Sequence, residues 1–244
     1  MINQIDRIAP THRPGGRNDG TQSWRSLLFC HWQVPLRAVQ ACLPAGLEVD
    51  TFDGQAFVGV VPFKMRAVRP RWLPTRLGFN FLETNVRTYV TYNGRPGVYF
   101  FSLDANSRLA VWAARTGWSL PYRFAQMSAA ENGQRYSYQS RRQSGGEGHR
   151  VTFRIDQERG ESAPETLEHF LLERYLMFVG QRKKLFVGQV YHRPYHAFTA
   201  IIDDMHDDLV AASGLPSTNQ LPELAHYCHG VDVEVFGIRR LPLV

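Results

Sequence analysis

The sequence predicts a β-rich α+β fold with a barrel-like or sandwich-like core and a few short helices packed on it. The clearest evidence is a hairpin at 81–104, because strand-like alternation flanks Asn93-Gly94, the strongest short-range turn signal. The nearly continuous apolar run Ala56–Phe63 favours a buried central strand. Strand-like segments number roughly ten or eleven against three or four short helices, which is typical of such a core.

Residues 1–22 are rich in Gly, Pro, Asn and Arg, so we expect a poorly ordered N-terminal tail. No linker or internal repeat interrupts 23–244, which predicts a single domain. Proline is well tolerated in the first turn of a helix, and Pro35 therefore predicts a helix start. The elements expected up to residue 65 are a strand over 24–34, a helix over 36–43, and a hairpin of 47–52 with 55–65 about Asp53-Gly54.

The second half of the chain contains one strong helix signal. Ser162 to Glu165 has the pattern of a capping box with proline in the first turn, and apolar residues follow at helical spacing. A helix is therefore predicted over 164–178. The other elements expected after residue 65 are a loop over 66–80, a helix over 108–116, a short strand at 120–123, a polar hairpin of 134–142 with 150–157, strands over 185–192, 197–202 and 231–236, and a helical turn at 209–213.

Composition narrows the class of protein. The 244-residue chain has 43% hydrophobic and 20% charged residues, which is ordinary for a soluble globular protein. No apolar run approaches the ~20 residues of a membrane span, and no secretory signal is evident. We therefore expect a cytoplasmic protein without a membrane partner. Its three cysteines, Cys30, Cys42 and Cys228, lack a CxxC spacing and are expected to be buried thiols rather than disulfides or zinc ligands.

The net charge of +6 comes almost entirely from arginine. Only three of the 28 basic residues are lysine, namely Lys64, Lys183 and Lys184, and the arginines are spread along the chain. Nucleic-acid-binding proteins usually concentrate basic residues on one face, so no nucleic-acid partner is expected. An amine that forms an imine must be desolvated or lie near another cation. Lys64, at the end of a buried strand, is a better candidate than the pair at 183–184, whose turn keeps it solvated.

Neither a metal nor a cofactor is expected. His192 and His196, four residues apart in an extended segment, would lie about 13 Å apart on one face, too far for a single ion. His226 and His229 would need a helix to share an ion, and no third ligand is evident. The chain has no Gly-x-Ser-x-Gly motif, which argues against a serine nucleophile of that type. It also has no glycine-rich phosphate loop, which argues against nucleotide hydrolysis and dinucleotide binding.

Polar residues alternate along the first strand of the Asn93-Gly94 hairpin. Glu83, Asn85 and Arg87 share one face of that strand, and apolar residues share the same face, which favours a lined cavity. A solvated outer face, or a network of groups that neutralise one another, is the alternative. The pairs predicted by counting outward from the turn are Tyr92 with Arg95, Arg87 with Phe100, Asn85 with Ser102 and Glu83 with Asp104.

This patch has the chemistry of a small-molecule site. The guanidinium of Arg87 matches a carboxylate ligand bidentately and stays charged. A carboxylate facing another carboxylate has a raised pKa and can act as an acid or a base, which makes Glu83 and Asp104 candidates for that role.

Motifs that together form a specific pattern extend over most of the chain, about 24–241. They are Phe29-x-x-Trp-x-Val-Pro35, Leu43-Pro-x-Gly-Leu-x-Val-Asp50, Asp53-Gly-x-Ala-Phe-Val-Gly59, Glu83-x-Asn-Val-Arg-Thr-Tyr89, Gly97-Val-Tyr-Phe-Phe-Ser-Leu-Asp104, Ala114-Arg115, Leu120-Pro-Tyr122 and Thr166-Leu-Glu-x-Phe-Leu-x-Glu-Arg-Tyr175. These motifs resemble the bacterial YqjF-like family of uncharacterised proteins. That family is similar in fold to acetoacetate decarboxylase, which implies a barrel-like core with a central cavity.

The resemblance to the decarboxylase also bears on mechanism. There a glutamate on a cavity strand and a lysine pair carry the reaction, and Glu83 resembles that glutamate. The segment 113–125 is similar to the one that holds the lysines, but Tyr122 and Arg123 stand in their place. Tyrosine cannot form an imine with a ketone, so the Schiff-base mechanism is expected to be absent here.

Together these observations predict a cavity for a small organic acid or carbonyl compound, with lyase-type or hydrolase-type chemistry that needs no lysine. Whether the protein is an enzyme is left open. The alternative is a non-enzymatic sensor or carrier of a small hydrophobic ligand, and a homo-oligomer is compatible with either. The residues expected to be catalytic are Glu83, Asp104 and Tyr122, and those expected to bind the ligand are Asn85, Arg87, Ser102 and Arg123.

Overall fold

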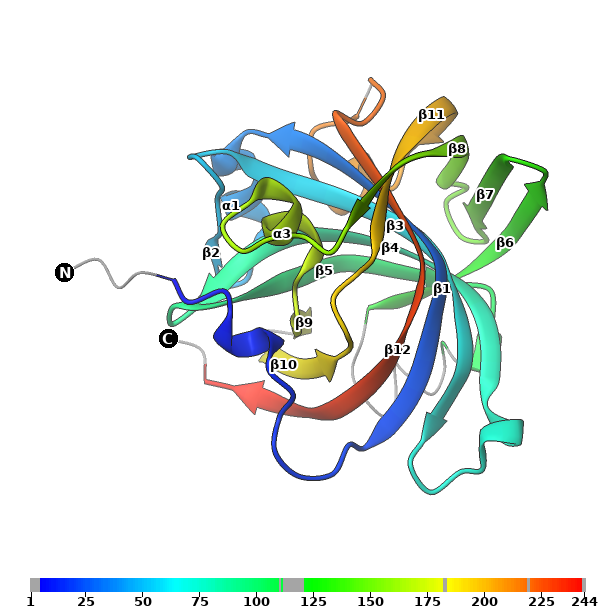
Figure 1. The fold of residues 1–244 in the computed structure, drawn as a ribbon. Coiled ribbons are helices and arrows are strands. Elements are labelled where there is room, and N and C mark those ends of the chain that lie inside the picture. The colour runs from blue at the N-terminus through cyan, green and yellow to red at the C-terminus, as the bar shows by residue number, and fades with distance from the viewer. Residues whose placement is uncertain (1–4, 110, 112–120, 182–183, 219, 243–244) are drawn as a thin grey trace.

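The computed structural model describes residues 5–109, 111, 121–181, 184–218 and 220–242. Within these ranges seven strands form a closed, hydrogen-bonded ring, which is the barrel in Figure 1. The ring runs β12–β1–β3–β4–β5–β9–β10 and back to β12, with β5 and β9 parallel and the other neighbours antiparallel. These strands are β1 (Gly20–Val34), β3 (Ala56–Pro70), β4 (Phe79–Tyr92), β5 (Arg95–Ala105), β9 (Leu176–Gln181), β10 (Lys184–Tyr191) and β12 (Leu224–Leu241).

A second layer of strands covers part of the barrel's outer face. It leaves the barrel where β6 pairs with β5 and returns to it where β11 pairs with β12. Its strands are β6 (Tyr122–Asn132), β7 (Arg135–Arg142), β8 (Gly148–Gly160) and β11 (Ala197–Asp207). The remaining elements are α1 (Leu36–Cys42), α3 (Leu167–Leu172), the short strand β2 (Glu48–Val49), and the 3-10 turns η1 (Ala9–Thr11), η2 (Thr75–Leu77) and η3 (Ala211–Ser213).

Three apolar cores occur in the described residues, and the first two follow from the alternation of the barrel strands. Alternate residues of the barrel strands point inward and form the first core, to which Phe29, Phe63 and Phe100 belong. Residues on the opposite faces, such as Val60 and Val86, pack with Phe153 of the second layer in the second core. The β-rich α+β fold predicted from the sequence is therefore confirmed. No helix within the described ranges has both the length and the apolar sequence that would carry it across a membrane.

The central hairpin follows the predicted register only in part. Tyr92 pairs with Arg95 and Arg87 pairs with Phe100, as counting from the turn predicts. Phe101 is then an extra residue in β5, and beyond this bulge Asn85 pairs with Leu103 and Glu83 with Ala105. The predicted pairs of Asn85 with Ser102 and Glu83 with Asp104 are therefore wrong. Because side chains alternate, the one-residue slip turns Ser102 and Asp104 to the outer face of the barrel.

The helix predicted over 164–178 is wrong in length. Helix α3 covers only Leu167–Leu172, and its N-cap is Thr166, whose hydroxyl accepts a hydrogen bond from the backbone N–H of His169 at 3.2 Å. Glu165 has a positive φ of 66°, which a helix does not allow. The following apolar residues form β9 instead, because β10 and β5 satisfy the backbone groups on its two sides. An apolar run cannot by itself distinguish a strand from a helix.

Several other boundaries differ from the sequence-based expectation. The predicted loop over 66–80 is shorter, because β3 extends to Pro70 and β4 begins at Phe79, with a bulge between Met65 and Val68. The turn at Asp53-Gly54 is closed by the pair Phe52–Gln55, but β2 pairs with β4 rather than with β3. Strand β6 is longer than predicted. The helix expected over 108–116 lies almost entirely outside the described residues.

The N-terminal stretch makes contacts with the barrel. Of the residues assigned to a poorly ordered tail, the described part 5–22 includes η1 and the start of β1. Arg7 forms an ion pair with Asp50, and Arg13 donates to Glu234 at 2.6 Å. The division into a tail and one domain stays a prediction.

We expect a side chain at Gly97 to disturb the closure of the barrel. A Cβ there would lie 2.7 Å from Cε2 of Phe178 and closer still to the carbonyl oxygen of Leu176, where β9 approaches β5. Overpacking of this kind costs roughly 1–3 kcal/mol. Gly97→Ala should therefore lower the urea midpoint of unfolding. Gly15→Ala, which has no neighbour within 4 Å, is the matched control. Equal midpoints for both variants would contradict this packing.

Candidate functional site

Four buried polar side chains belong to the inner side of the barrel wall, and we call them the inner polar cluster. Alternation along β4 directs Glu83, Asn85 and Arg87 inward, and Tyr122, the first residue of β6, reaches the same place. Their exposed fractions are 4%, 5%, 7% and 7%, respectively. Charged groups are almost never this deeply buried without a partner or a function.

Glu83 and Tyr122 form a close pair. The Tyr122 hydroxyl donates to Oε2 of Glu83 at 2.5 Å. Burial raises the pKa of Glu83 to about 7, although the hydrogen bonds from Tyr122 and Asn85 act in the opposite direction. Burial and the Glu83 charge raise the pKa of Tyr122 well above its usual value, so the phenol stays protonated. Glu83 can therefore gain or lose a proton near neutral pH, with Tyr122 as a fixed donor.

Arg87 and Asn85 keep polar atoms without a protein partner in the described part of the chain. Nη2 of Arg87 donates to the carbonyl oxygen of Leu171 at 3.1 Å, and its guanidinium lies 5.3 Å from the centre of the Phe29 ring. Nε of Arg87 and Oδ1 of Asn85 are buried and unpaired. Leaving such groups unpaired costs about 1–3 kcal/mol each, so a polar partner at either atom would remove that cost.

His31 offers a free ring nitrogen near the cluster. The Tyr89 hydroxyl donates to the carbonyl oxygen of Leu171 and lies 2.8 Å from Nε2 of His31. Since that hydroxyl has one proton, Nε2 of His31 must be the donor to Tyr89, and the unpaired Nδ1 is an acceptor. Burial and the Arg87 charge lower the pKa of His31 well below its usual value, so the ring is neutral.

His192 is a second buried imidazole with an unpaired acceptor nitrogen. Its Nδ1 lies 2.7 Å from the carbonyl oxygen of Arg193 and must donate to it, which leaves the buried Nε2 as an unpaired acceptor. Burial is the main cause that lowers its pKa to about 4, and the Arg87 charge adds to the effect. Arg87 thus has two neutral imidazoles, those of His31 and His192, among its surroundings.

Gly59 on β3 leaves the space that these side chains need. It pairs with Arg87 of β4 and with His31 of β1. A Cβ at Gly59 would lie 3.1 Å from Cδ2 of His31 and 3.5 Å from Cγ of Arg87. A residue with a side chain would therefore press the imidazole away from the guanidinium.

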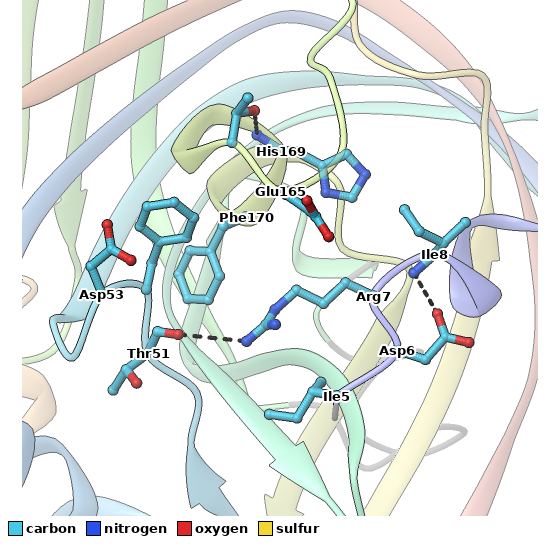
Figure 2. Close-up of a pocket in the computed structure, with 11 residues that line it drawn as sticks. Ile5, Asp6, Arg7, Ile8, Thr51, Asp53, Glu165, His169 and Phe170 are labelled. Carbon is cyan, nitrogen blue, oxygen red and sulfur yellow. Dashed lines mark hydrogen bonds between the residues drawn. The ribbon is translucent and has the colours of Figure 1, made fainter. Parts of the chain in front are cut away.

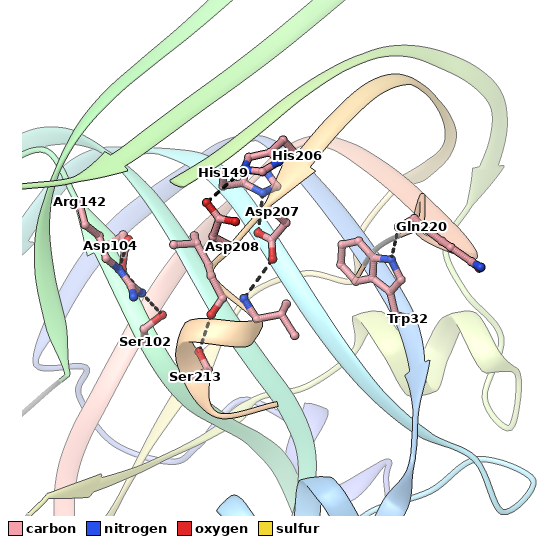
Figure 3. Close-up of polar contacts among 12 residues, drawn as sticks. Trp32, Ser102, Asp104, Arg142, His149, His206, Asp207, Asp208, Ser213 and Gln220 are labelled. Carbon is pink, nitrogen blue, oxygen red and sulfur yellow. Dashed lines mark hydrogen bonds and ion pairs between the residues drawn. The ribbon is translucent and has the colours of Figure 1, made fainter. Parts of the chain in front are cut away.

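The structure separates three predicted site residues from this cluster. Asp104 and Ser102 lie on the outer face, where both bind Arg142 (Figure 3): Nε and Nη2 of Arg142 donate to Asp104 at 2.8 and 2.9 Å, and Nη2 also donates to Ser102 at 2.9 Å. Burial raises the pKa of Asp104, and the Arg142 contact opposes that rise. Arg123 is exposed. The predicted patch is therefore divided between the two faces of the barrel wall.

Sequence reasoning missed several partners of these groups. His31 shares a face of its strand with Phe29 in the alternation pattern, but nothing in the sequence indicates that Tyr89 faces it. Arg142 lies in a hairpin that the sequence analysis assigns to the periphery as too polar for the core, yet it is 3% exposed. Only the structure shows that the Arg142 side chain binds Ser102 and Asp104 of β5.

No described lysine nitrogen has been found at the inner polar cluster. Lys64 is half-buried on β3 and alternates with Phe63, which points inward. Lys184 is exposed, and Lys183 lies outside the described residues. Among the described residues no group of three or more His, Cys, Asp or Glu side chains has a geometry suited to a metal ion.

A surface pocket of about 480 Å³ lies on the other side of α3 (Figure 2). Phe170 forms part of its wall, and the Phe170 ring centre lies 4.9 Å from that of Tyr89. Arg7 in this pocket and the buried Arg174 both pair with Asp50, the latter at 3.0 Å. The pocket is thus separated from the inner polar cluster by the buried residues of α3.

The raised pKa of Glu83 predicts a specific pH dependence of stability. The folded protein binds this proton more tightly than the unfolded chain, whose pKa is near 4.5. The stabilisation is therefore complete below about pH 4.5 and is lost as the pH rises through about 7. Glu83→Gln keeps an oxygen acceptor for Tyr122 and cannot ionise. We expect it to be more stable than the parent at pH 8, by up to about 3 kcal/mol.

The measurement is the free energy of unfolding in urea between pH 4 and pH 8, as a difference between variant and parent. Glu48→Gln, at an exposed position of β2, is the matched control and should track the parent at every pH. A difference curve for Glu83→Gln that stays flat across this range would show that folding does not raise the pKa of the Glu83 carboxyl.

The comparisons with known proteins agree with the geometry of the fold. The model of the DUF2071 family, described as an uncharacterized conserved protein, matches residues 21–232. The uncharacterized protein YqjF of Bacillus subtilis (strain 168) is 37% identical over 221 residues, which is 90% of this chain and 91% of that protein.

Two solved structures have a similar fold. Acetoacetate decarboxylase from Legionella pneumophila subsp. pneumophila str. Philadelphia 1 superposes with a TM-score of 0.66 at 14% identity, over 99% of this chain and 98% of that one. The enduracididine biosynthesis enzyme MppR, complexed with pyruvate, gives 0.65 at 12% identity, over 95% and 94%. At these identities the likeness concerns the fold alone. The chain belongs to the DUF2071 family of YqjF-like proteins and has an acetoacetate decarboxylase-like fold.

Proposed function

We propose that the inner polar cluster binds a small organic acid that also carries a carbonyl group. The observation that carries this proposal is that one face of β4 holds both Glu83, whose pKa is raised to about 7, and Arg87, whose buried Nε has no protein partner in the described residues. Both side chains point into the same apolar interior. A guanidinium binds a carboxylate with two parallel hydrogen bonds, which makes Arg87 the anchor for the acid group.

The spacing along β4 supports a small ligand. Glu83 and Arg87 are four residues apart, so their Cα atoms are separated by about 13 Å. This separation matches a molecule of a few carbon atoms, with its carboxylate at Arg87 and its carbonyl group towards Glu83 and Tyr122. Asn85 lies between them, and its free Oδ1 can accept a hydrogen bond from the ligand.

In this arrangement each group has a distinct chemical role. When the ligand binds, Tyr122 turns its single O–H proton from Glu83 to the carbonyl oxygen, and the freed carboxyl of Glu83 takes or returns a proton at an adjacent carbon. The fold neighbour MppR was solved with pyruvate, a molecule of this class, which makes pyruvate the first probe. Direct ligand contact is not expected for Asp104, Ser102 or Arg123, because they lie on the outer face of the barrel or on the surface. A cytoplasmic location remains part of the prediction.

Ligand-induced stabilisation tests the role of Arg87. We expect pyruvate and acetoacetate to raise the Tm of the parent protein in a dose-dependent way and to have at least tenfold weaker effect on Arg87→Gln, since the fork to the carboxylate is lost (~10-fold per ~1.4 kcal/mol). Arg87→Lys keeps the charge and should retain part of the shift.

Two conservative variants serve as controls. Ser102→Ala and Arg123→Gln alter residues that the sequence assigned to ligand binding, and both should keep the full ligand shift. If the shift survives in Arg87→Gln but disappears in either control, the ligand binds outside the barrel and the proposal is wrong.

A chemical test addresses the absence of imine chemistry. Incubation with pyruvate and borohydride traps an imine as a stable amine, which intact-mass spectrometry detects. We expect no mass increase, because Tyr122 cannot form an imine. An adduct mapped to Lys64, Lys183 or Lys184 would replace proton transfer by Glu83 with a Schiff-base mechanism.

A second candidate function has one observation in its favour. The rings of Trp24, Phe63, His192 and Tyr195 lie in contact inside the barrel, with ring centres 4.5 to 5.8 Å apart along the chain of neighbours. An interior of this kind also suits a hydrophobic ligand held by a non-enzymatic sensor or carrier. Native mass spectrometry of the purified protein distinguishes the two, because a retained aromatic or lipid-like mass would favour the carrier.

A further inference from the structure

The end of the β3–β4 hairpin, residues 66–80, carries exposed apolar residues. We call it the β3–β4 tip. Trp72 is 81% exposed, Leu77 54% and Phe79 41%. Eight large hydrophobic residues are exposed in the described part of the chain, and these three lie within eight consecutive positions. Such local concentration differs from the single exposed hydrophobic residues that are normal on protein surfaces.

The same tip is strongly basic. No Asp or Glu occurs from residue 54 to 82, whereas this stretch contains five basic residues. Arg66, Arg71 and Arg76 are exposed, and none of the ion pairs found among the described residues involves them. The other two basic residues are Lys64 and Arg69, which are half-buried.

The tip is a preformed structure. Nη1 of Arg69 donates to the carbonyl oxygen of Leu73 at 3.0 Å, and Oδ1 of Asn80 accepts from the backbone N–H of Ala67 at 2.9 Å. The backbone of Arg71 donates to Asp19 at 2.8 Å, which ties the tip to the chain preceding β1. Figure 1 shows the turn with η2 projecting beyond the barrel wall. Hydrogen bonds therefore hold the backbone on both sides of the exposed Trp72.

The charge of the molecule identifies the kind of partner. With a net charge of +6, two copies repel each other, and two tips brought together would repel further. The exposed acidic residues of β11 that could receive a basic tip are already paired, Asp203 with Arg154 and Asp204 with Arg150. A nucleic acid would satisfy the arginines but would leave Leu77 and Phe79 without an apolar contact.

An anionic lipid bilayer satisfies both features of the tip. Tryptophan prefers the headgroup region, and arginine is attracted to the negative surface of anionic leaflets. We propose that the β3–β4 tip docks the protein peripherally on an anionic bilayer, with Trp72 and Leu77 at the headgroup level and Arg71 and Arg76 against the lipid phosphates. The proposed contact is peripheral, and it differs from the sequence-based expectation that the protein has no membrane partner.

Vesicle co-sedimentation tests this inference with the full-length protein. Vesicles of phosphatidylcholine alone are compared with vesicles that also contain phosphatidylglycerol. We expect binding only to the mixed vesicles and a drop of about tenfold or more from low to high salt. Trp72→Ala with Leu77→Ser, and separately Arg71→Gln with Arg76→Gln, should each reduce binding by about tenfold or more.

Leu36→Ser with Arg37→Gln on α1 is the matched control, since it also removes one exposed leucine and one exposed arginine. It should bind like the parent. All substituted positions are exposed, so the Tm values should be equal, and the pyruvate-induced shift should persist in the tip variants. The membrane inference and the proposed ligand site are thereby tested independently.

Three results would overturn the inference. One is absence of binding to the mixed vesicles, or binding that the tip variants leave unchanged. The second is a parent protein that does not bind vesicles and a Trp72→Ala with Leu77→Ser variant whose molecular mass, measured by light scattering, is lower than that of the parent. That result would assign the tip to contact with a second copy of the chain. The third is a salt-sensitive gel shift with an oligonucleotide, lost in Arg71→Gln with Arg76→Gln, again without vesicle binding.

Discussion

Closure of the barrel through β9 and β10 is the constraint on which the interior chemistry depends. These two short strands join β5 to β12, and without them the inner face of β4 would border on water. Enclosure removes water from Glu83, and this desolvation is the main reason that its pKa reaches about 7.

The two faces of the barrel wall bury charge in different ways. On the outer face Asp104 receives two hydrogen bonds from Arg142, and Ser102 accepts a third, so that the network is complete in itself. This buried pair links the end of β7 to β5, with β6 between them in the sheet. On the inner face Arg87 and Glu83 do not pair with each other, and Arg87 and Asn85 retain unpaired atoms in the described structure. This contrast favours a structural role outside and a binding role inside.

The distribution of arginine follows the same division. Buried arginines such as Arg142 and Arg174 have carboxylate partners at 2.8 to 3.0 Å. Arg87 instead has a carbonyl oxygen and aromatic rings as neighbours. The arginines of the β3–β4 tip are exposed beside apolar side chains. An arginine without a carboxylate partner thus occurs at each of the two places where we propose that an anion binds.

The sequence by itself determined the β-rich class, the turn at Asn93-Gly94 and the inward face of β4, because alternation and turn chemistry are local properties. Local pairing also gave the register correctly as far as Arg87 and Phe100. The extra residue Phe101 was decided by tertiary structure, since a bulge depends on how a strand must bend to close the barrel. It carried Ser102 and Asp104 to the outer face. The choice of strand for 176–181 had the same origin: only the backbone groups of β5 and β10, distant in sequence, made a strand more favourable there than a longer helix.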